Sequence, residues 1–89
     1  QVLCTLAAWE SAQFCRERLG LATPLGQIER ARLNVRGSSL AIGHPFAATG
    51  ARIVATLAKL LSQDGAARRG LISVCTAGGM GVTAIVERA

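Results

Sequence analysis

A short apolar run, a Gly-His-Pro junction and a long helical stripe follow one another in mid-chain, and this succession constrains the fold most. Residues 38–42 are largely apolar and bounded by Gly37 and Gly43, which is typical of a strand. Pro45 suits the first position of a helix, because its ring fixes φ and its missing N–H is not needed there. Apolar side chains then recur at helical spacing over residues 47–63. We therefore expect a strand that leads into a helix.

The flanking segments extend this to an α/β fold. Residues 2–19 carry a helical stripe, and Gly20 follows as a candidate C-cap. Apolar runs at 71–74 and 82–86 predict two strands joined by a Gly-rich turn, which should be antiparallel. The expected order is α-β-α-β-β. Its β-α-β unit would make strands 38–42 and 71–74 parallel neighbours with a right-handed crossover.

Composition excludes disorder and argues against nucleic-acid binding. Hydrophobic residues make up 51% of the 89 residues, which favours one small packed domain. Aromatic residues are only 3%, whereas a surface that stacks bases needs exposed aromatics. The net charge is +5, but the arginines are scattered along the chain. Such a surface is usually just solvated, and the functional alternative is attraction of an anionic ligand.

Cysteine usage and hydropathy indicate in which cellular compartment the chain works and whether it spans a membrane. Three cysteines without a C-x-x-C pair predict neither a disulfide scaffold nor a metal site, so we expect no metal and a cytoplasmic location. No apolar stretch approaches the roughly 18 residues of a transmembrane helix, and the signal-peptide layout is lacking. Because the apolar pattern is already running at Gln1, we expect a piece of a longer protein.

His44 and Cys75 are the residues whose type and expected position indicate chemistry. His44 is the only histidine, and Cys75 directly follows the predicted 71–74 strand. If the two strands are parallel neighbours, both residues lie at carboxyl ends, where ligand sites of α/β folds gather. A neutral imidazole can accept a proton from a thiol or donate a hydrogen bond to an oxyanion. The structural alternatives are a helix-capping or satisfied core histidine, and a small buried cysteine.

The glycines beside these two residues favour a loop that a ligand can approach closely. Gly43 precedes the histidine, and Gly78 and Gly79 follow the cysteine, so we expect these three to shape the site. The chain lacks the Gly-Lys-Ser/Thr ending of a phosphate loop, and no helix follows the second glycine cluster. Neither a phosphate loop nor a dinucleotide fingerprint is therefore predicted.

Two sequence blocks together resemble the C-terminal end of the thiolase family. They read Asn34-x-x-Gly37-Ser38-x-x-Ala41-x-Gly43-His44-Pro45-x-x-Ala48-Thr49-Gly50-Ala51-Arg52 and Cys75-x-Ala77-Gly78-Gly79-x-Gly81. Their order and separation match those of the family, and the resemblance covers almost the whole chain. The stretch Gly43-His44-Pro45-Phe46-Ala47-Ala48-Thr49-Gly50 is similar to the long-chain branch, which includes trifunctional-enzyme β subunits. Residues 1–89 thus resemble part of the C-terminal thiolase domain.

The resemblance implies a fold, a reaction and a set of residue roles. The fold would be part of a mixed sheet with flanking helices, in a homo-oligomer. The reaction would be thiolytic cleavage of 3-ketoacyl-CoA by CoA in fatty-acid metabolism, or the reverse Claisen condensation. CoA is then a substrate, and no cofactor is expected. By resemblance, His44 activates a nucleophilic cysteine and helps bind the thioester oxygen. Cys75 handles the proton of the acetyl α-carbon, and the N–H of Ala77 belongs to an oxyanion hole.

The resemblance also implies that parts of the machinery lie outside this sequence. The nucleophilic cysteine belongs to the N-terminal half of a thiolase, and neither Cys4 nor Cys15 matches its motif. We therefore expect the 89 residues alone to be inactive and to need that half as a partner. Two alternatives remain open. One is a non-catalytic thiolase-like protein that binds an acyl chain or serves as a scaffold. The other is a small basic nucleic-acid-binding module, which the scattered arginines disfavour.

Overall fold

The computed structural model describes all 89 residues, which fall into two units, residues 1–36 and 37–89. The first unit contains α1 (Val2–Glu10), α2 (Ala12–Leu19) and a short 3-10 helix η1 (Arg30–Arg32). The second contains α3 (Ser39–Ile42), α4 (Ala48–Gln63), β1 (Arg69–Cys75) and β2 (Gly81–Glu87). The α/β class expected from the sequence is confirmed.

In the first unit, the single helix predicted over residues 2–19 is wrong in one respect, because it breaks at Ser11. The backbone of Ser11 is extended (ψ 115°), and its side chain accepts a hydrogen bond of 3.2 Å from the amide of Phe14. A serine hydroxyl competes with the helical backbone in this way and starts a new helix. At the other end, Gly20 takes the predicted C-cap position with a left-handed backbone (φ 67°).

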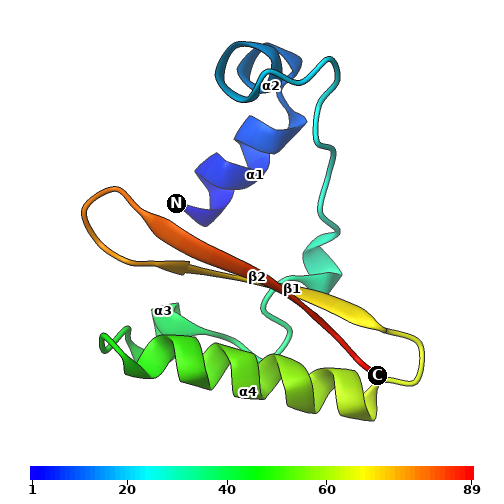
Figure 1. Ribbon diagram of the computed structural model, residues 1–89, viewed down its shortest axis with the longest axis vertical. Helices are drawn as coiled ribbons and strands as arrows, with labels where there is room; N and C mark the ends of the chain where they lie inside the picture. The colour runs from blue at the N-terminus through cyan, green and yellow to red at the C-terminus, as the bar shows by residue number, and fades with distance from the viewer. The chain divides into compact units, whose positions relative to one another are not determined.

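In the second unit, β1 and β2 form an antiparallel hairpin with α4 lying alongside it (Figure 1). The register pairs Cys75 with Gly81 at one end and Arg69 with Glu87 at the other. The antiparallel pairing of the last two strands was predicted correctly. Along β1 the half-buried positions alternate with exposed ones, as expected for a sheet that packs on one face only.

The strand predicted over residues 38–42 is wrong, because these residues form the single helical turn α3. The amides of Ala41 and Ile42 bond back to the carbonyl of Ser38. Leu40 is fully exposed, so its apolar side chain does not mark a core strand. An apolar run of this length fits a strand or a short helical turn equally well by periodicity. The expected β-α-β unit with its parallel pair is therefore absent.

The helix predicted over residues 47–63 is confirmed at its end and shifted slightly at its start. α4 begins at Ala48, and Pro45 lies before it rather than at its first position. The carbonyl of Pro45 accepts the amides of Ala48 and Thr49, each at 3.2 Å. Ala47, which lies between Pro45 and the start of α4, has a left-handed backbone (φ 69°). The chain therefore makes a tight bend, and not a direct entry, before α4.

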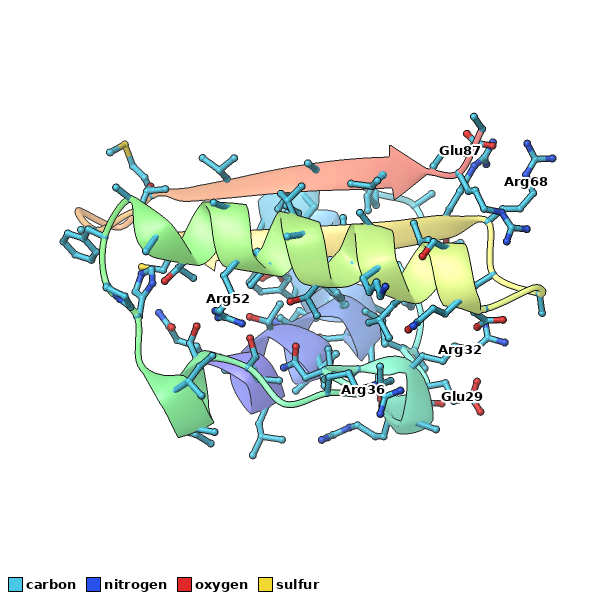
Figure 2. The ribbon with its side chains drawn as sticks, turned by 90° about the horizontal axis from the view of Figure 1, so that it is seen from below. Glu29, Arg32, Arg36, Arg52, Arg68 and Glu87 are labelled. Carbon is cyan, nitrogen blue, oxygen red and sulfur yellow. The ribbon has the colours of Figure 1, made fainter.

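Arginine side chains form hydrogen bonds at both ends of α4. Arg52 of α4 donates to the hydroxyl of Ser39 at 2.7 Å, which links α3 to α4 (Figure 2). At the opposite end, Arg88 donates to the carbonyls of Leu61 (3.2 Å) and Asp64 (3.0 Å), where α4 ends. One arginine thus holds the bend between α3 and α4, and another holds the C-terminal end of α4. No helix of the chain has both the length and the apolar character needed to span a bilayer.

Candidate active site

The bend between α3 and α4 presents His44. Gly43 ends α3 with φ 90° and ψ 177°, a conformation that glycine reaches easily and residues with a Cβ rarely adopt. The amide of Gly43 donates to the carbonyl of Ser39 at 2.8 Å. The next residue, His44, is exposed, so the alternative of a histidine satisfied inside a core is wrong.

Both ring nitrogens of His44 have hydrogen-bond partners. Nε2 lies 3.1 Å from the main-chain carbonyl oxygen of Cys75, and Nδ1 lies 2.8 Å from Oγ1 of Thr49. The first contact joins the bend before α4 to the end of β1. The structure therefore brings the two predicted residues together, although the parallel-strand argument for their proximity is wrong. The hairpin places the end of β1 beside a loop, and not beside a second parallel strand.

These partners indicate which tautomer the neutral ring adopts. A carbonyl oxygen only accepts, so Nε2 must carry the hydrogen, and Nδ1 is then the acceptor. The hydroxyl of Thr49 supplies the hydrogen for Nδ1. It also lies 3.2 Å from the carbonyl of Pro45, but that oxygen already accepts two amides. In the neutral ring, the single hydroxyl hydrogen therefore goes to Nδ1; when Nδ1 itself carries a hydrogen, the hydroxyl accepts from it and donates to the carbonyl of Pro45.

Phe46 makes the third contact of the ring. Its ring centroid lies 5.4 Å from that of His44, and the two planes make an angle of 68°, which is the edge-to-face arrangement that aromatic pairs prefer. Phe46 is itself 74% exposed. It therefore adds an apolar contact to His44 without being fixed by a surrounding core.

The turn after Cys75 has a left-handed backbone and leaves the amide of Ala77 without a partner. Ala77, Gly78 and Gly79 all have positive φ, at 65°, 63° and 74°. The turn closes through hydrogen bonds from Thr76 N to Met80 O (3.2 Å) and from Met80 N to Ala77 O (3.1 Å). The amide of Ala77 donates to no other group of the chain. A free N–H in such a turn is available to a negatively charged oxygen.

Cys75 is exposed and free, like Cys4, whereas Cys15 is fully buried. The alternative of a small buried core cysteine is therefore wrong for Cys75. Cys15, by contrast, is a small buried core cysteine, and its thiol lies 3.5 Å from the carbonyl of Trp9. An accessible thiol, a histidine N–H and an unpaired backbone amide thus gather around one turn. Together they can move a proton and stabilise a developing oxyanion.

Comparison with known proteins decides the family. The family model described as "Thiolase, C-terminal domain" matches residues 6–88. The chain belongs to the thiolase family. Among curated thiolases, the 3-ketoacyl-CoA thiolases of Shewanella sp. (strain W3-18-1) and Aeromonas salmonicida are each 44% identical to it, over 87 and 88 residues. That of Pectobacterium carotovorum is also 44% identical, over 88 residues.

These matches cover 98% of the chain but 20% of each relative. The chain thus spans about a fifth of the length of the curated thiolases that it matches. The family assignment confirms the resemblance drawn from the Gly-His-Pro and Cys-x-x-Gly-Gly blocks.

Sequence reasoning missed the two residues that support the bend, Thr49 and Arg52. Both stand in the thiolase-like block, but neither was given a role. Thr49 is only 3% exposed, and its position five residues after the only histidine was the available signal. Its hydroxyl reaches Nδ1 only because the chain folds back at Ala47 (φ 69°), and nothing in the sequence predicts that conformation for an alanine.

Proposed function

We propose that this chain supplies part of the active site of a thiolase that cleaves 3-ketoacyl-CoA with CoA, or runs the reverse Claisen condensation. The observation that carries the proposal is the 3.1 Å contact between Nε2 of His44 and the carbonyl of Cys75. It gathers the family's two candidate catalytic residues and the Gly-rich turn in one place. Family membership and the names of the relatives support the choice of reaction.

The chemistry requires an acid and base near the α-carbon. Thiolysis breaks the bond between the α- and β-carbons of the 3-ketoacyl group, and the electron pair stays on the α-carbon as a thioester enolate. That carbon then needs a proton to become acetyl-CoA. In the condensation direction, the same proton is removed. We assign this step to the thiol of Cys75, which is exposed at the end of β1.

Stabilisation of negative oxygen is the second requirement. The Nε2–H of His44 donates to the Cys75 carbonyl in the free chain, and a thioester oxygen can replace that acceptor. The unpaired amide of Ala77 can donate to a second oxyanion. Removing one such donor typically lowers the rate by about 10²–10³-fold.

Activation of a nucleophilic cysteine by His44 is a separate requirement. A ring that accepts a proton on Nε2 must first carry none there, whereas the hydrogen bond to a carbonyl needs Nε2–H. The activating role therefore requires the His44–Cys75 contact to open and the ring proton to move. The donor role to the thioester oxygen follows directly from the observed contact, and we propose it as the primary role of His44.

The remaining parts of the proposal concern partners and setting. The nucleophilic cysteine and the binding site for CoA would come from the N-terminal thiolase half, and the 89 residues alone would be inactive. Leu71 and Ile85, on the face of the hairpin opposite α4, are 52% and 72% exposed, which fits a surface that this partner covers. A homo-oligomer, a place in fatty-acid β-oxidation and a cytoplasmic location complete the proposal.

The two alternatives receive less support. The nucleic-acid module needs a basic face with free arginines, but several arginines are partnered within the chain. Arg68 pairs with Glu87 at 3.4 Å (Figure 2), and Arg69 pairs with the same carboxylate at 3.2 Å. A lipid-binding or scaffold protein without turnover has no use for an exposed cysteine whose carbonyl contacts a histidine. We therefore favour the enzyme.

The test is a chimera in which residues 1–89 replace the matching segment of the Shewanella 3-ketoacyl-CoA thiolase. The purified, folded chimera should cleave 3-ketoacyl-CoA in the presence of CoA, and its His44→Ala variant should be slower by about 100-fold or more. The isolated chain should show no thiolysis above buffer. Turnover by the isolated chain, or equal activity of the chimera and its His44→Ala variant, would contradict the proposal.

A further inference from the structure

Thr49 is the buried polar side chain beside the candidate site. It is 3% exposed, whereas His44, Phe46 and Cys75, which it supports directly or through the ring, are all exposed. It also belongs to the first turn of the long helix α4. Of the groups that touch the His44 ring, Thr49 is therefore the one whose position is fixed by packing and by a helix.

The geometry at Thr49 specifies what it does to the ring. Its hydroxyl oxygen lies 2.8 Å from Nδ1, which is a normal length for a strong hydrogen bond to a ring nitrogen. In the neutral ring, with Nε2–H donating to the Cys75 carbonyl, Nδ1 is the acceptor and Thr49 the donor. A hydroxyl can rotate to donate or to accept, so the second contact of the ring decides the direction.

We propose that Thr49 is the positioning residue of His44: its hydroxyl holds Nδ1 as the acceptor, so that Nε2–H points at the Cys75 turn. The inference rests on the proposed function, since the aimed N–H is the one assigned to the thioester oxygen. Phe46 contributes less to this aim, because it is largely exposed. Arg52 and Ser39 fix the bend from its other side and do not touch the ring.

The chain is well suited to a spectroscopic test, because His44 is its only histidine. In the ¹⁵N-labelled 89-residue chain, long-range ¹H–¹⁵N correlation at alkaline pH should show Nε2 as the protonated nitrogen. Nδ1 should resonate as a pyridine-type nitrogen shifted by an accepted hydrogen bond. Thr49→Val should remove that shift and increase the ring's motion on the picosecond-to-nanosecond scale. Thr49→Ser, which keeps the hydroxyl, should restore both.

Thr56→Val is the matched control. Thr56 stands on the same helix and donates to the carbonyl of Arg52 at 2.8 Å, but it does not contact the histidine. This variant loses a helical threonine hydroxyl and should leave the His44 spectrum unchanged. Circular dichroism of all the variants checks that α4 remains folded. If Thr49→Val fails to fold, the tautomer of the unsubstituted chain and the Thr49→Ser spectrum still decide the question.

The proposal is overturned if the neutral ring carries its hydrogen on Nδ1, or if Thr49→Val leaves both the Nδ1 resonance and the ring motion unchanged. Activity separates this inference from the proposed function. In the thiolase chimera, Thr49→Val should lower kcat by about 10- to 100-fold with little change in KM, because it misaligns a group without removing it. An inactive chimera with the expected His44 spectrum would contradict the function and leave the positioning role standing.

Discussion

Ala77 has a left-handed backbone (φ 65°) in the turn that follows Cys75, where an L-residue with a Cβ is strained by about 1–2 kcal/mol. Ala77→Gly should therefore stabilise the chain by up to about 1 kcal/mol, because the gain exceeds the entropy that glycine loses on folding. Chemical denaturation followed by circular dichroism measures the change. The amide of residue 77 is kept, so a chimera carrying this substitution should retain its activity.

Ala55→Gly is the control for this substitution. Ala55 lies inside α4, where the backbone is helical and glycine costs about 1 kcal/mol relative to alanine. The two Ala-to-Gly changes should therefore shift stability in opposite directions. A loss of similar size at both positions would show that residue 77 is not strained.

At the residue scale, the sequence led to His44, Cys75 and the Gly-rich turn because their types and spacing form a motif. It did not lead to Thr49, because the role of this side chain depends on one backbone bend. It also led to the proximity of His44 and Cys75 by an incorrect route. The contact is made through the Cys75 carbonyl, a group that every residue has and that no sequence pattern reveals.

At the scale of elements, Gly70 sets how closely β1 approaches α4. A Cβ on this residue would overlap the side chain of Leu57, with its Cδ2 and Cγ at 2.9 and 3.0 Å. Gly70→Ala should therefore destabilise the chain by about 1–3 kcal/mol, because the helix and strand must separate or Leu57 must leave its rotamer. Thermal unfolding followed by circular dichroism measures the loss.

A double substitution separates steric overlap from other causes. Leu57→Ala removes the overlapping atoms, so adding Gly70→Ala to the Leu57→Ala chain should cost clearly less than it does alone. Strictly additive effects would mean that the strand does not need glycine for its approach to α4.

The elements that the sequence predicted best are those with the longest patterns. The helical stripe of α4 and the hairpin strands were found because each has repeated apolar positions. The segment at residues 38–42 was misassigned as a strand, because its apolar side chains are turned to the surface and carry no core signal. Arg52, which ties α3 to α4 through Ser39, is a long-range partner that local periodicity cannot report.

At the scale of the whole molecule, the chain has little core of its own. Leu61 and Thr49 are the buried residues of the second unit, and the face of the hairpin opposite α4 exposes Leu71 and Ile85. Ile85→Ser should change the stability of the isolated chain by no more than about 0.5 kcal/mol, as at other exposed positions. In the thiolase chimera the same substitution should cost about 1–3 kcal/mol, because the side chain is covered there.

Val54→Ser serves as a comparison for this prediction. Val54 is 41% exposed on α4 and lies outside the exposed face of the hairpin. Val54→Ser should therefore change the stability of the isolated chain and of the chimera by similar amounts. Thermal unfolding measures the stability change for each of the two substitutions, in the isolated chain and in the chimera. Equal losses for Ile85→Ser in the isolated chain and the chimera would contradict a covered hairpin face.

The central claim is that this chain brings the acid/base of the α-carbon step to a thiolase site, and Cys75→Ser in the folded chimera tests it most directly. A serine hydroxyl is a far weaker acid than a thiol, so the condensation of two acetyl-CoA molecules should fall by about 100-fold or more. Exchange of the acyl group between the enzyme and CoA, which needs no α-proton transfer, should persist in part. Equal loss of condensation and exchange, or unchanged condensation, would contradict the claim.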